Sequence, residues 1–201
     1  MIDLTKTLNA SMEVYPGDFQ FKIIENNPVR FIDDRIHSAY QIFTMKNHNG
    51  THIDFPAHKI LGGKTSSDFT LNYFINRALL LDSRNNLILP NLSFIEKNKI
   101  SAILIWTGQL IASLNVQIVD FLCKMPSLKL IGTDALTVDN YKENTVHLKL
   151  LQKDILIVEG LCNLDKISQK FNKEPFMFFS IPLPLEKSDG SPVRAFVDSI
   201  I

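Results

Sequence analysis

Three histidines and an aspartate crowd into one short stretch of this chain, KNHNGTHIDFPAHK at residues 46–59. The histidines are His48, His52 and His58, three of the five in the chain, and Asp54 lies between the last two. Imidazole and carboxylate ligands without a thiolate are typical of zinc, manganese or iron in catalytic sites, whereas structural zinc sites more often use cysteine. The stretch therefore predicts a catalytic metal site, with a histidine-rich surface loop as the alternative.

The spacing within this stretch decides how its side chains can meet. Gly50, Pro56 and the β-branched Thr51 and Ile53 disfavour a helix, which excludes the helical zinc motif with two histidines on one face. Side chains alternate between the two faces of an extended chain, and positions 48, 52, 54 and 58 are all even. One extended or gently turning segment could therefore direct all four polar side chains to the same side.

A complete metal site needs further ligands from elsewhere in the chain. Of the two remaining histidines, His37 and His147, the second is the better candidate because Glu159 follows it by twelve residues, after the apolar segment DILIV. A carboxylate at the end of a buried strand is costly unless it is paired or bound to a metal. Taken alone, His147 is better explained as a residue in the first turn of a helix, and Glu159 as an ordinary carboxylate at the end of a strand. The case for both as ligands depends on the first cluster.

The elements that must position these groups are mostly short strands. The apolar segments AILIW and DILIV predict buried strands, and the alternating segment YQIFTMK predicts a half-exposed one. Four more segments have strand-like composition: FQFKII, RALLLD, LKLIG and PFMFFSI. Together they predict a mixed α/β fold with a strand-rich first half.

Three helices are expected between these strands. Asn115 is a candidate cap for a helix over 116–125, whose apolar face would carry Val116, Val119, Phe121 and Leu122. Thr145 is a candidate cap for a helix over 146–153, which would place His147 in its first turn. Residues 162–171 predict the third helix.

Composition limits the class of protein. A chain of 201 residues, 45% hydrophobic and 21% charged, suits one globular domain over residues 1–201. The formal net charge is zero, so we expect neither a nucleic acid nor a membrane as partner, and the longest apolar run is too short to cross a bilayer. The first residues do not resemble a signal peptide, and Cys123 and Cys162 lie far apart outside any CxxC motif. The expected location is the cytoplasm.

With these residues in view, the chain resembles the cyclase-like metal-dependent hydrolases, whose best-known members are bacterial kynurenine formamidases. The segments that carry the resemblance are IDLTKTLNASMEVYPGD, HNGTHIDFPAH, GGKTSSDFTLNYFINRALLLD, ILIWTGQ, LIGTDALTVD, HLKLLQKDILIVEGLCNLDKI and DGSPVRAF. The resemblance implies a single α/β domain with a β-rich core flanked by helices, a cyclase or swivelling β/β/α-like fold. It also implies assembly as a homodimer or homotetramer.

The resemblance assigns a role to each matching position. His48, His52 and Asp54 correspond to ligands of a first metal. Asp54 and Glu159 correspond to carboxylates shared between two metals, and His147 to a ligand of the second. Up to two divalent ions are therefore expected per chain, zinc first and manganese as the alternative.

The remaining match of this kind is His58, which corresponds to the catalytic acid and base of the family. An imidazole has an ordinary pKa near 6.5, so such a side chain could move a proton from an attacking water to a leaving nitrogen. The residues thus indicate metal-assisted hydrolysis of a small amide, formamide or cyclic amide. The expected partner is a small-molecule substrate.

The substrate end of the chain differs from the kynurenine formamidases. Tyr15 stands in YPGD where those relatives usually carry a tryptophan that lines the pocket. We therefore expect Tyr15 to contact substrate, with an aromatic residue that merely flanks the turn as the alternative. The loop after ILIWTG is also shorter. Arg194 is expected to form a structural ion pair; the alternative is that it binds a carboxylate of the substrate. The sequence leaves open whether Thr107 and Asp134 support the site through hydrogen bonds.

The predicted function is a kynurenine formamidase-like metal-dependent amidohydrolase. One alternative is an isatin-hydrolase-like enzyme, or another hydrolase of the same family with a different substrate. A second is a metal-containing protein that binds a small molecule without catalysis. A third is a structural α/β domain with a fortuitous histidine loop.

Overall fold

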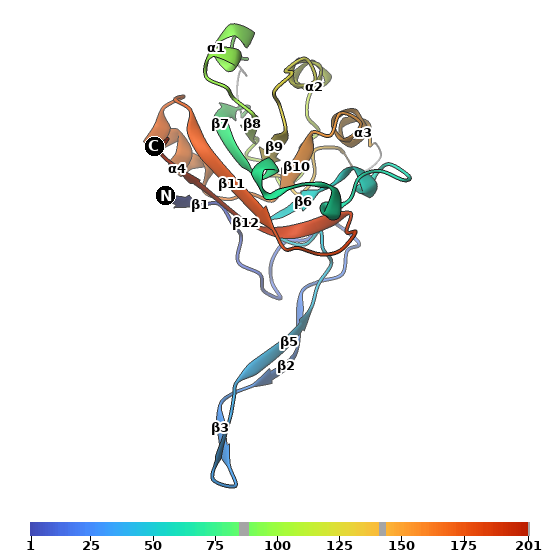
Figure 1. The fold of residues 1–201 in the computed structure, drawn as a ribbon, viewed down its shortest axis with the longest axis vertical. Coiled ribbons are helices and arrows are strands. Elements are labelled where there is room, and N and C mark those ends of the chain that lie inside the picture. Colours follow the sequence, from blue (N-terminus) through green and yellow to red (C-terminus); the bar gives the residue numbers. More distant parts are fainter. Residues whose placement is uncertain (85–88, 141–143, 201) are drawn as a thin grey trace.

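Four apolar strands run parallel through the centre of the computed structural model, which describes residues 1–84, 89–140 and 144–200 (Figure 1). Parallel neighbours need a crossover connection, and a helix supplies it each time. The strands are β7 (Ile75–Asp82), β8 (Ala102–Trp106), β9 (Leu130–Thr133) and β10 (Leu156–Glu159). The helices between them are α1 (Leu92–Lys97), α2 (Val116–Leu122) and α3 (Thr145–Leu151).

Three antiparallel strands close this sheet on itself. Within the described residues the order is β12-β11-β7-β8-β9-β10-β6, and β6 also pairs with β12, so the seven strands form a ring. The short strand β1 (Ile2–Asp3) extends the other edge of β12. The closing strands are β6 (His52–Asp54), β11 (Phe176–Pro182) and β12 (Gly190–Asp198).

Both faces of the central strands are buried, which explains their uninterrupted apolar sequences. Alternate residues such as Ile103 and Ile105 pack toward helices α1, α2 and α3. Their neighbours Ala102 and Leu104 pack on the opposite face, together with Phe55 and residues of α4 (Leu164–Phe171). The predicted α/β class with a β-rich core is therefore confirmed.

The predicted helices are present, with changes at their caps. The Asn115 side chain accepts a hydrogen bond from Gln117 N and caps α2 as expected, but Val116 is exposed and Ile118 is buried in its place. Thr145 is the first residue of α3 and not its cap. The Asp139 side chain instead accepts hydrogen bonds from the first backbone amides of α3.

Several strands were not predicted, the longest of them β12, and one segment has a different shape. DGSPVRAF, in which no strand was predicted, opens β12, because its pairing with β6 and β11 outweighs the glycine and proline. The histidine segment is not extended throughout: residues 47–51 turn, β6 is only three residues long, and the 3₁₀ turn η1 (Pro56–His58) follows. Two more such turns come next, η2 (Ser66–Asp68) and η3 (Leu71–Tyr73).

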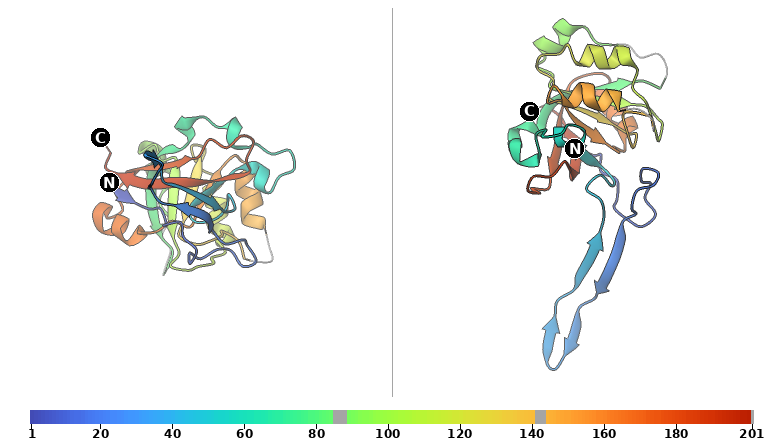
Figure 2. Two further views of the ribbon diagram at one scale, coloured as in Figure 1. Left: turned by 90° about the horizontal axis from the view of Figure 1, so that it is seen from below. Right: turned by 90° about the vertical axis from the view of Figure 1, so that its right-hand side faces the viewer.

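The segment 22–44 forms a long hairpin that projects from the body in Figure 1 and in the right-hand view of Figure 2. Strands β2 (Lys22–Asn27) and β5 (Tyr40–Thr44) pair near the body, and β3 (Arg30–Ile32) and β4 (Arg35–His37) pair at the tip. We call this hairpin the arm. YQIFTMK was expected to bury one face, but β5 is exposed on both faces along most of its length, because no second layer covers it. Among the described residues, no helix is long and apolar enough to span a bilayer.

Candidate metal centre

The pairing of β6 with β10 brings together two parts of the site that are far apart in sequence. Glu159 lies directly opposite His52, and Ile157 opposite Asp54, in an antiparallel register. Directly opposed residues point to the same face of a sheet. His52, Asp54 and Glu159 are all buried, with between 1% and 4% of their surface exposed.

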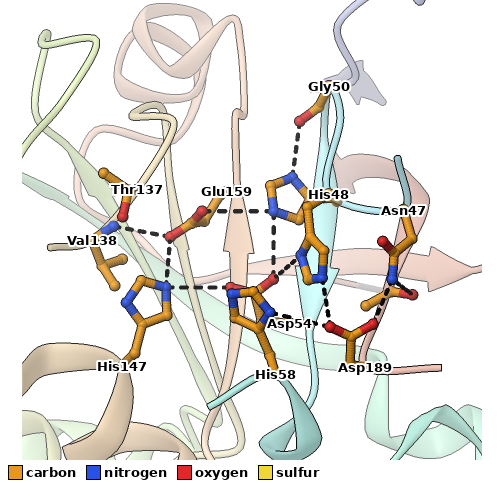
Figure 3. Close-up of polar contacts among 12 residues, drawn as sticks. Asn47, His48, Gly50, Asp54, His58, Thr137, Val138, His147, Glu159 and Asp189 are labelled. Atoms are coloured by element: carbon orange, nitrogen blue, oxygen red, sulfur yellow. Dashed lines mark hydrogen bonds and ion pairs between the residues drawn. The ribbon is translucent and has the colours of Figure 1, made fainter. Parts of the chain in front are cut away.

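In each of the two carboxylates, Asp54 and Glu159, one oxygen faces His52 and the other faces His147 (Figure 3). Asp54 Oδ1 lies 2.8 Å from His48 Nδ1 and 3.4 Å from His52 Nε2, while Asp54 Oδ2 lies 3.5 Å from His147 Nε2. Glu159 Oε2 lies 3.6 Å from His52 Nε2, and its Oε1 lies 3.3 Å from His147 Nε2. The five side chains thus form two adjoining groups of nitrogen and oxygen atoms that share both carboxylates.

His147 is held by a carboxylate that the sequence analysis did not identify. Asp139 Oδ2 lies 2.7 Å from His147 Nδ1 and also accepts the backbone amide of His147 at 3.0 Å. This contact leaves Nε2 of His147 directed at Asp54 and Glu159. The backbone amide of Val138 donates to Glu159 Oε1 at 2.9 Å and fixes that carboxylate in turn.

The position of His48 depends on glycines on both sides. A Cβ atom on Gly190 would lie 2.3 Å from His48 Cε1, so only glycine leaves room for the ring there. Gly50 has a φ of +70°, in the left-handed region that favours glycine, and its carbonyl oxygen lies 3.1 Å from His52 Nδ1. This backbone turn carries the chain from His48 into β6.

His58 lies beside the two groups and contacts a second unpredicted carboxylate. Its ring centroid is 4.1 Å from that of His48, and its Nδ1 lies 3.3 Å from Asp189 Oδ2. The same oxygen lies 3.1 Å from His48 Nε2, and the Asn47 side-chain amide donates to the other oxygen at 2.6 Å. Asp189 therefore connects His58 with His48.

The electrostatics separate the histidines into two kinds. Burial alone would lower the pKa of His48, but its contacts with Asp54 and Asp189 outweigh burial and raise that pKa to about 9. Burial also opposes charge on His147, yet the neighbouring carboxylates raise its pKa to about 11. For His58 burial dominates and lowers the pKa to about 4, so this imidazole is neutral at physiological pH.

The residues present fit a divalent metal. Asp54 Oδ2 is buried without a hydrogen-bond partner, a costly state for a carboxylate oxygen that a bound cation would relieve. The ligand atoms of His52, Asp54 and Glu159 all lie within 4.8 Å of one another. Those of His48, Asp54 and His58 form a second such group, so His58 too is within reach of an ion. Neutral imidazoles with shared carboxylates are a donor set for zinc or manganese.

A pocket of about 270 Å³ opens over these groups. Tyr15 lies in its wall, and Leu136 and Thr137 line another part. Two lysines stand at the pocket: Lys46, whose ammonium is ion-paired with Asp18, and Lys59.

The remaining candidates lie outside the pocket. His37 is exposed in β4 of the arm, and Arg194 forms an exposed ion pair with Asp3, which is the structural role expected of it. Asp134 accepts hydrogen bonds from the backbone and hydroxyl of Thr107 and stabilises the loop after β8. Asp139 and Asp189 were not predicted because they contact the site histidines only in the folded structure, and their spacing in the sequence gives no sign of these contacts.

Comparison with known proteins places this chain in a family. A family model described as "Putative cyclase" matches residues 2–140. The kynurenine formamidase of Geobacillus thermodenitrificans (strain NG80-2) is 32% identical over 209 residues, which cover 96% of this chain and 95% of that protein. The kynurenine formamidase of Bacillus cytotoxicus is 29% identical and covers 98% of this chain and 96% of its own length.

Solved structures agree on the fold. Isatin hydrolase A from Labrenzia aggregata superposes with a TM-score of 0.72 at 18% identity, over 98% of this chain and 92% of that one. Because the identity is low, this likeness concerns the fold alone, and the family assignment rests on the sequence matches. The chain belongs to the cyclase family of hydrolases.

Proposed function

We propose that this cyclase-family hydrolase is a metal-dependent amidohydrolase that cleaves a small amide, formamide or cyclic amide. The observation that carries the proposal is the pair of buried carboxylates, Asp54 and Glu159, each of which faces both histidine groups with its two oxygens. Such shared carboxylates are a recurring feature of sites that bind two metals a short distance apart. The relatives named kynurenine formamidase and the fold neighbour named isatin hydrolase support hydrolysis of a C–N bond.

The chain offers separate ligands for two ions. His48 and His52 would hold the first, His147 would hold the second, and Asp54 and Glu159 would be shared. Bound zinc or manganese lowers the pKa of a coordinated water and polarises a substrate carbonyl. Asp139 fixes the ring of His147 from behind, as supporting carboxylates do for metal-bound histidines.

His58 is the group that we assign to proton transfer. The Asp189 carboxylate beside Nδ1 favours the tautomer with its proton on that nitrogen, which leaves Nε2 able to accept a proton. Because His58 is neutral at physiological pH, it is ready to act as a base. It would take a proton from the attacking water and return it to the leaving nitrogen.

The pocket limits the substrate to a small molecule. Its volume of about 270 Å³ lies just below the usual range for small-molecule sites, which favours a substrate no larger than one ring with a short substituent. Tyr15 in the wall offers an aromatic face on which such a ring could stack. A formanilide or an isatin-like cyclic amide meets both conditions.

A turnover assay on purified protein tests the proposal. The substrates are a formanilide series, isatin and its derivatives, and simple lactams, each with added zinc or manganese. We expect metal-dependent hydrolysis of at least one class, lost in His58→Gln and retained in His37→Gln, a matched change on the arm. Binding of these compounds without turnover in metal-loaded wild-type protein would refute catalysis and favour a small-molecule-binding protein.

A further inference from the structure

One positive charge at the pocket has no acidic partner among the residues that the structure describes. Lys59 lines the pocket and is half-buried, yet no carboxylate within residues 1–84, 89–140 and 144–200 forms an ion pair with it. Lys46, which also lines the pocket, is ion-paired with Asp18. A half-buried charge without a partner is unfavourable, and an anionic ligand would relieve it.

The lysines nearest to Lys59 in the sequence are both used in the protein itself. Lys46 precedes it and is paired with Asp18, and Lys64 follows it and is ion-paired with Asp154, outside the pocket. Of these three lysines, Lys59 is the one whose charge is available to a ligand. Its position at the pocket is therefore not explained by a structural ion pair within the described residues.

The acidic groups deeper in the pocket are already occupied by histidines. Asp139 Oδ2 lies 2.7 Å from His147 Nδ1, and Glu159 lies between His147 and His52, at distances of 3.3 Å and 3.6 Å from their Nε2 atoms. These carboxylates do not offset the charge of Lys59. The described wall of the pocket therefore presents a net positive charge, which favours a negatively charged molecule.

Lys59 lies next to the residue that we assign to proton transfer. It ends the 3₁₀ turn that contains His58, and its backbone amide donates to Pro56 O at 3.2 Å. Burial is the largest cause of the low pKa of His58, and the positive charge of Lys59 lowers that pKa further, so the ammonium acts on the imidazole. Because His58 returns a proton to the leaving nitrogen in the proposed reaction, Lys59 is placed beside the amine half of the substrate.

The size of the pocket limits the anion. A volume of about 270 Å³ favours one ring with a short substituent, so the charge must be attached to the ring itself or through a short chain. Carboxylate is the smallest of the common organic anions, and it accepts a strong hydrogen bond from an ammonium group. We propose that Lys59 binds a carboxylate on the amine half of the substrate, and that the enzyme prefers a formamidobenzoate to an uncharged formanilide.

This inference rests on the proposed hydrolysis and adds the charge of the substrate to it. Lysine is a compact charge on a flexible stem, so it can reach a carboxylate at more than one position of the ring. The ortho, meta and para isomers of formamidobenzoate differ from formanilide only by a carboxylate at a defined position. They therefore measure both the preference for charge and the place where the charge binds.

Steady-state kinetics on these substrates test the proposal. In metal-loaded wild type we expect kcat/KM to be at least about tenfold higher for the best formamidobenzoate than for formanilide. Lys59→Met keeps the length of the side chain and removes its charge, so this ratio should fall by about tenfold, chiefly through a higher KM for the carboxylated substrate. Lys59→Arg restores the charge and should recover most of the preference.

A second lysine supplies the matched control. Lys64→Met makes the same change on the same segment, at a lysine paired with Asp154 outside the pocket, and should leave the preference at the wild-type value. Elemental analysis of each variant shows whether its metal content equals that of wild type. A wild type without preference for any formamidobenzoate, or a preference that Lys59→Met retains, would overturn the proposal.

A binding measurement separates failure of this inference from failure of the proposed hydrolysis. Benzoate and its uncharged analogue benzyl alcohol are titrated calorimetrically into zinc-loaded wild type and Lys59→Met. Any contact of benzoate with bound zinc is common to both proteins, so the difference between them reports Lys59. We expect benzoate to bind about tenfold more weakly to Lys59→Met, with or without turnover of any amide. Equal benzoate affinity in the two proteins would refute the carboxylate site even in an active hydrolase.

Discussion

Glu159 and His52 face each other in register across the antiparallel pair of β10 and β6, with Oε2 and Nε2 3.6 Å apart. The two residues are separated by more than half of the chain, yet one strand pairing places them in the same group. A shift of this pairing by one residue would turn Glu159 to the opposite face of the sheet. The register of two short strands therefore determines whether the metal site can form.

Loss of the proton-transfer group should separate chemistry from metal binding. In His58→Asn we expect kcat to fall by about 100-fold or more, the usual contribution of a general acid or base, while metal content stays at the wild-type level. Steady-state kinetics and elemental analysis of the same preparation provide the comparison. Because His58 lies within reach of an ion with His48 and Asp54, metal loss in this variant would identify it as a ligand instead.

Asp189 should act on the reaction through the two histidines that it contacts. Asp189→Asn removes the charge that orients His48 and His58, and supporting carboxylates of this kind are worth about 10- to 100-fold in metal affinity or activity. We expect kcat to fall in that range with KM changed by less than about twofold. Asp165→Asn, an exposed aspartate in α4, is the matched control. Equal kinetics of the two variants would show that Asp189 has no positioning role.

Gly190 should be intolerant of any side chain. The added methyl group of Gly190→Ala would lie 2.3 Å from the His48 ring and must displace it. We expect weaker metal binding, by about tenfold or more, in a chain that still unfolds cooperatively. Competition with a chromogenic chelator measures the affinity. Gly17→Ala is a contrasting variant that strains the backbone, at a φ of +88°, but places no Cβ within 4 Å of another atom, so it separates backbone strain from displacement of a ring. Wild-type affinity in Gly190→Ala would exclude His48 as a ligand.

Metal binding should strengthen as pH rises. In the metal-free chain the pKa of His48 is raised to about 9 and that of His147 to about 11, so both rings carry protons near neutral pH. A histidine whose pKa is higher in the folded state than in the unfolded state stabilises the metal-free protein. This stabilisation is complete below the unfolded-state pKa of about 6.5 and is lost as the pH rises through the folded-state pKa. A metal must displace the same protons.

The measurable consequence is a divergence between two melting curves. From pH 6.5 to pH 9 the Tm of the chelator-treated protein should fall, and the increase in Tm caused by a fixed free zinc concentration should grow. Thermal unfolding in metal-buffered solutions at several pH values tests this. A zinc-induced increase that stays constant or shrinks with pH would mean that these histidines are not deprotonated on binding.

The sequence was informative wherever a local pattern carried the signal. The central strands follow from apolar runs, α2 follows from its Asn115 cap, and the histidine cluster follows from residue type and spacing. The even-numbered positions 48, 52, 54 and 58 do converge, although a turn, a short strand and a 3₁₀ turn bring them together in place of one extended segment. The chemistry of the cluster was therefore easier to predict than its backbone.

Long-range contacts account for what the sequence analysis missed. Asp139 and Asp189 are ordinary turn or loop residues by composition, and only tertiary structure places them against His147, His48 and His58. The alternation in YQIFTMK suggested one buried face, yet this segment became a strand of the arm with both faces exposed. Alternating apolar and polar residues indicate that a strand has two different faces, but they do not show whether the apolar face is buried within the same chain.

The central claim is that Asp54 and Glu159 complete a metal site begun by the clustered histidines, and metal content per chain tests it most directly. The protein is purified without chelator or affinity-column metal, and zinc and manganese are measured in wild type, Glu159→Ala and the control His37→Ala. We predict up to two ions per chain in wild type and in the control, and a sharp decrease in Glu159→Ala. Wild type that holds no ion even after incubation with zinc or manganese would contradict the account.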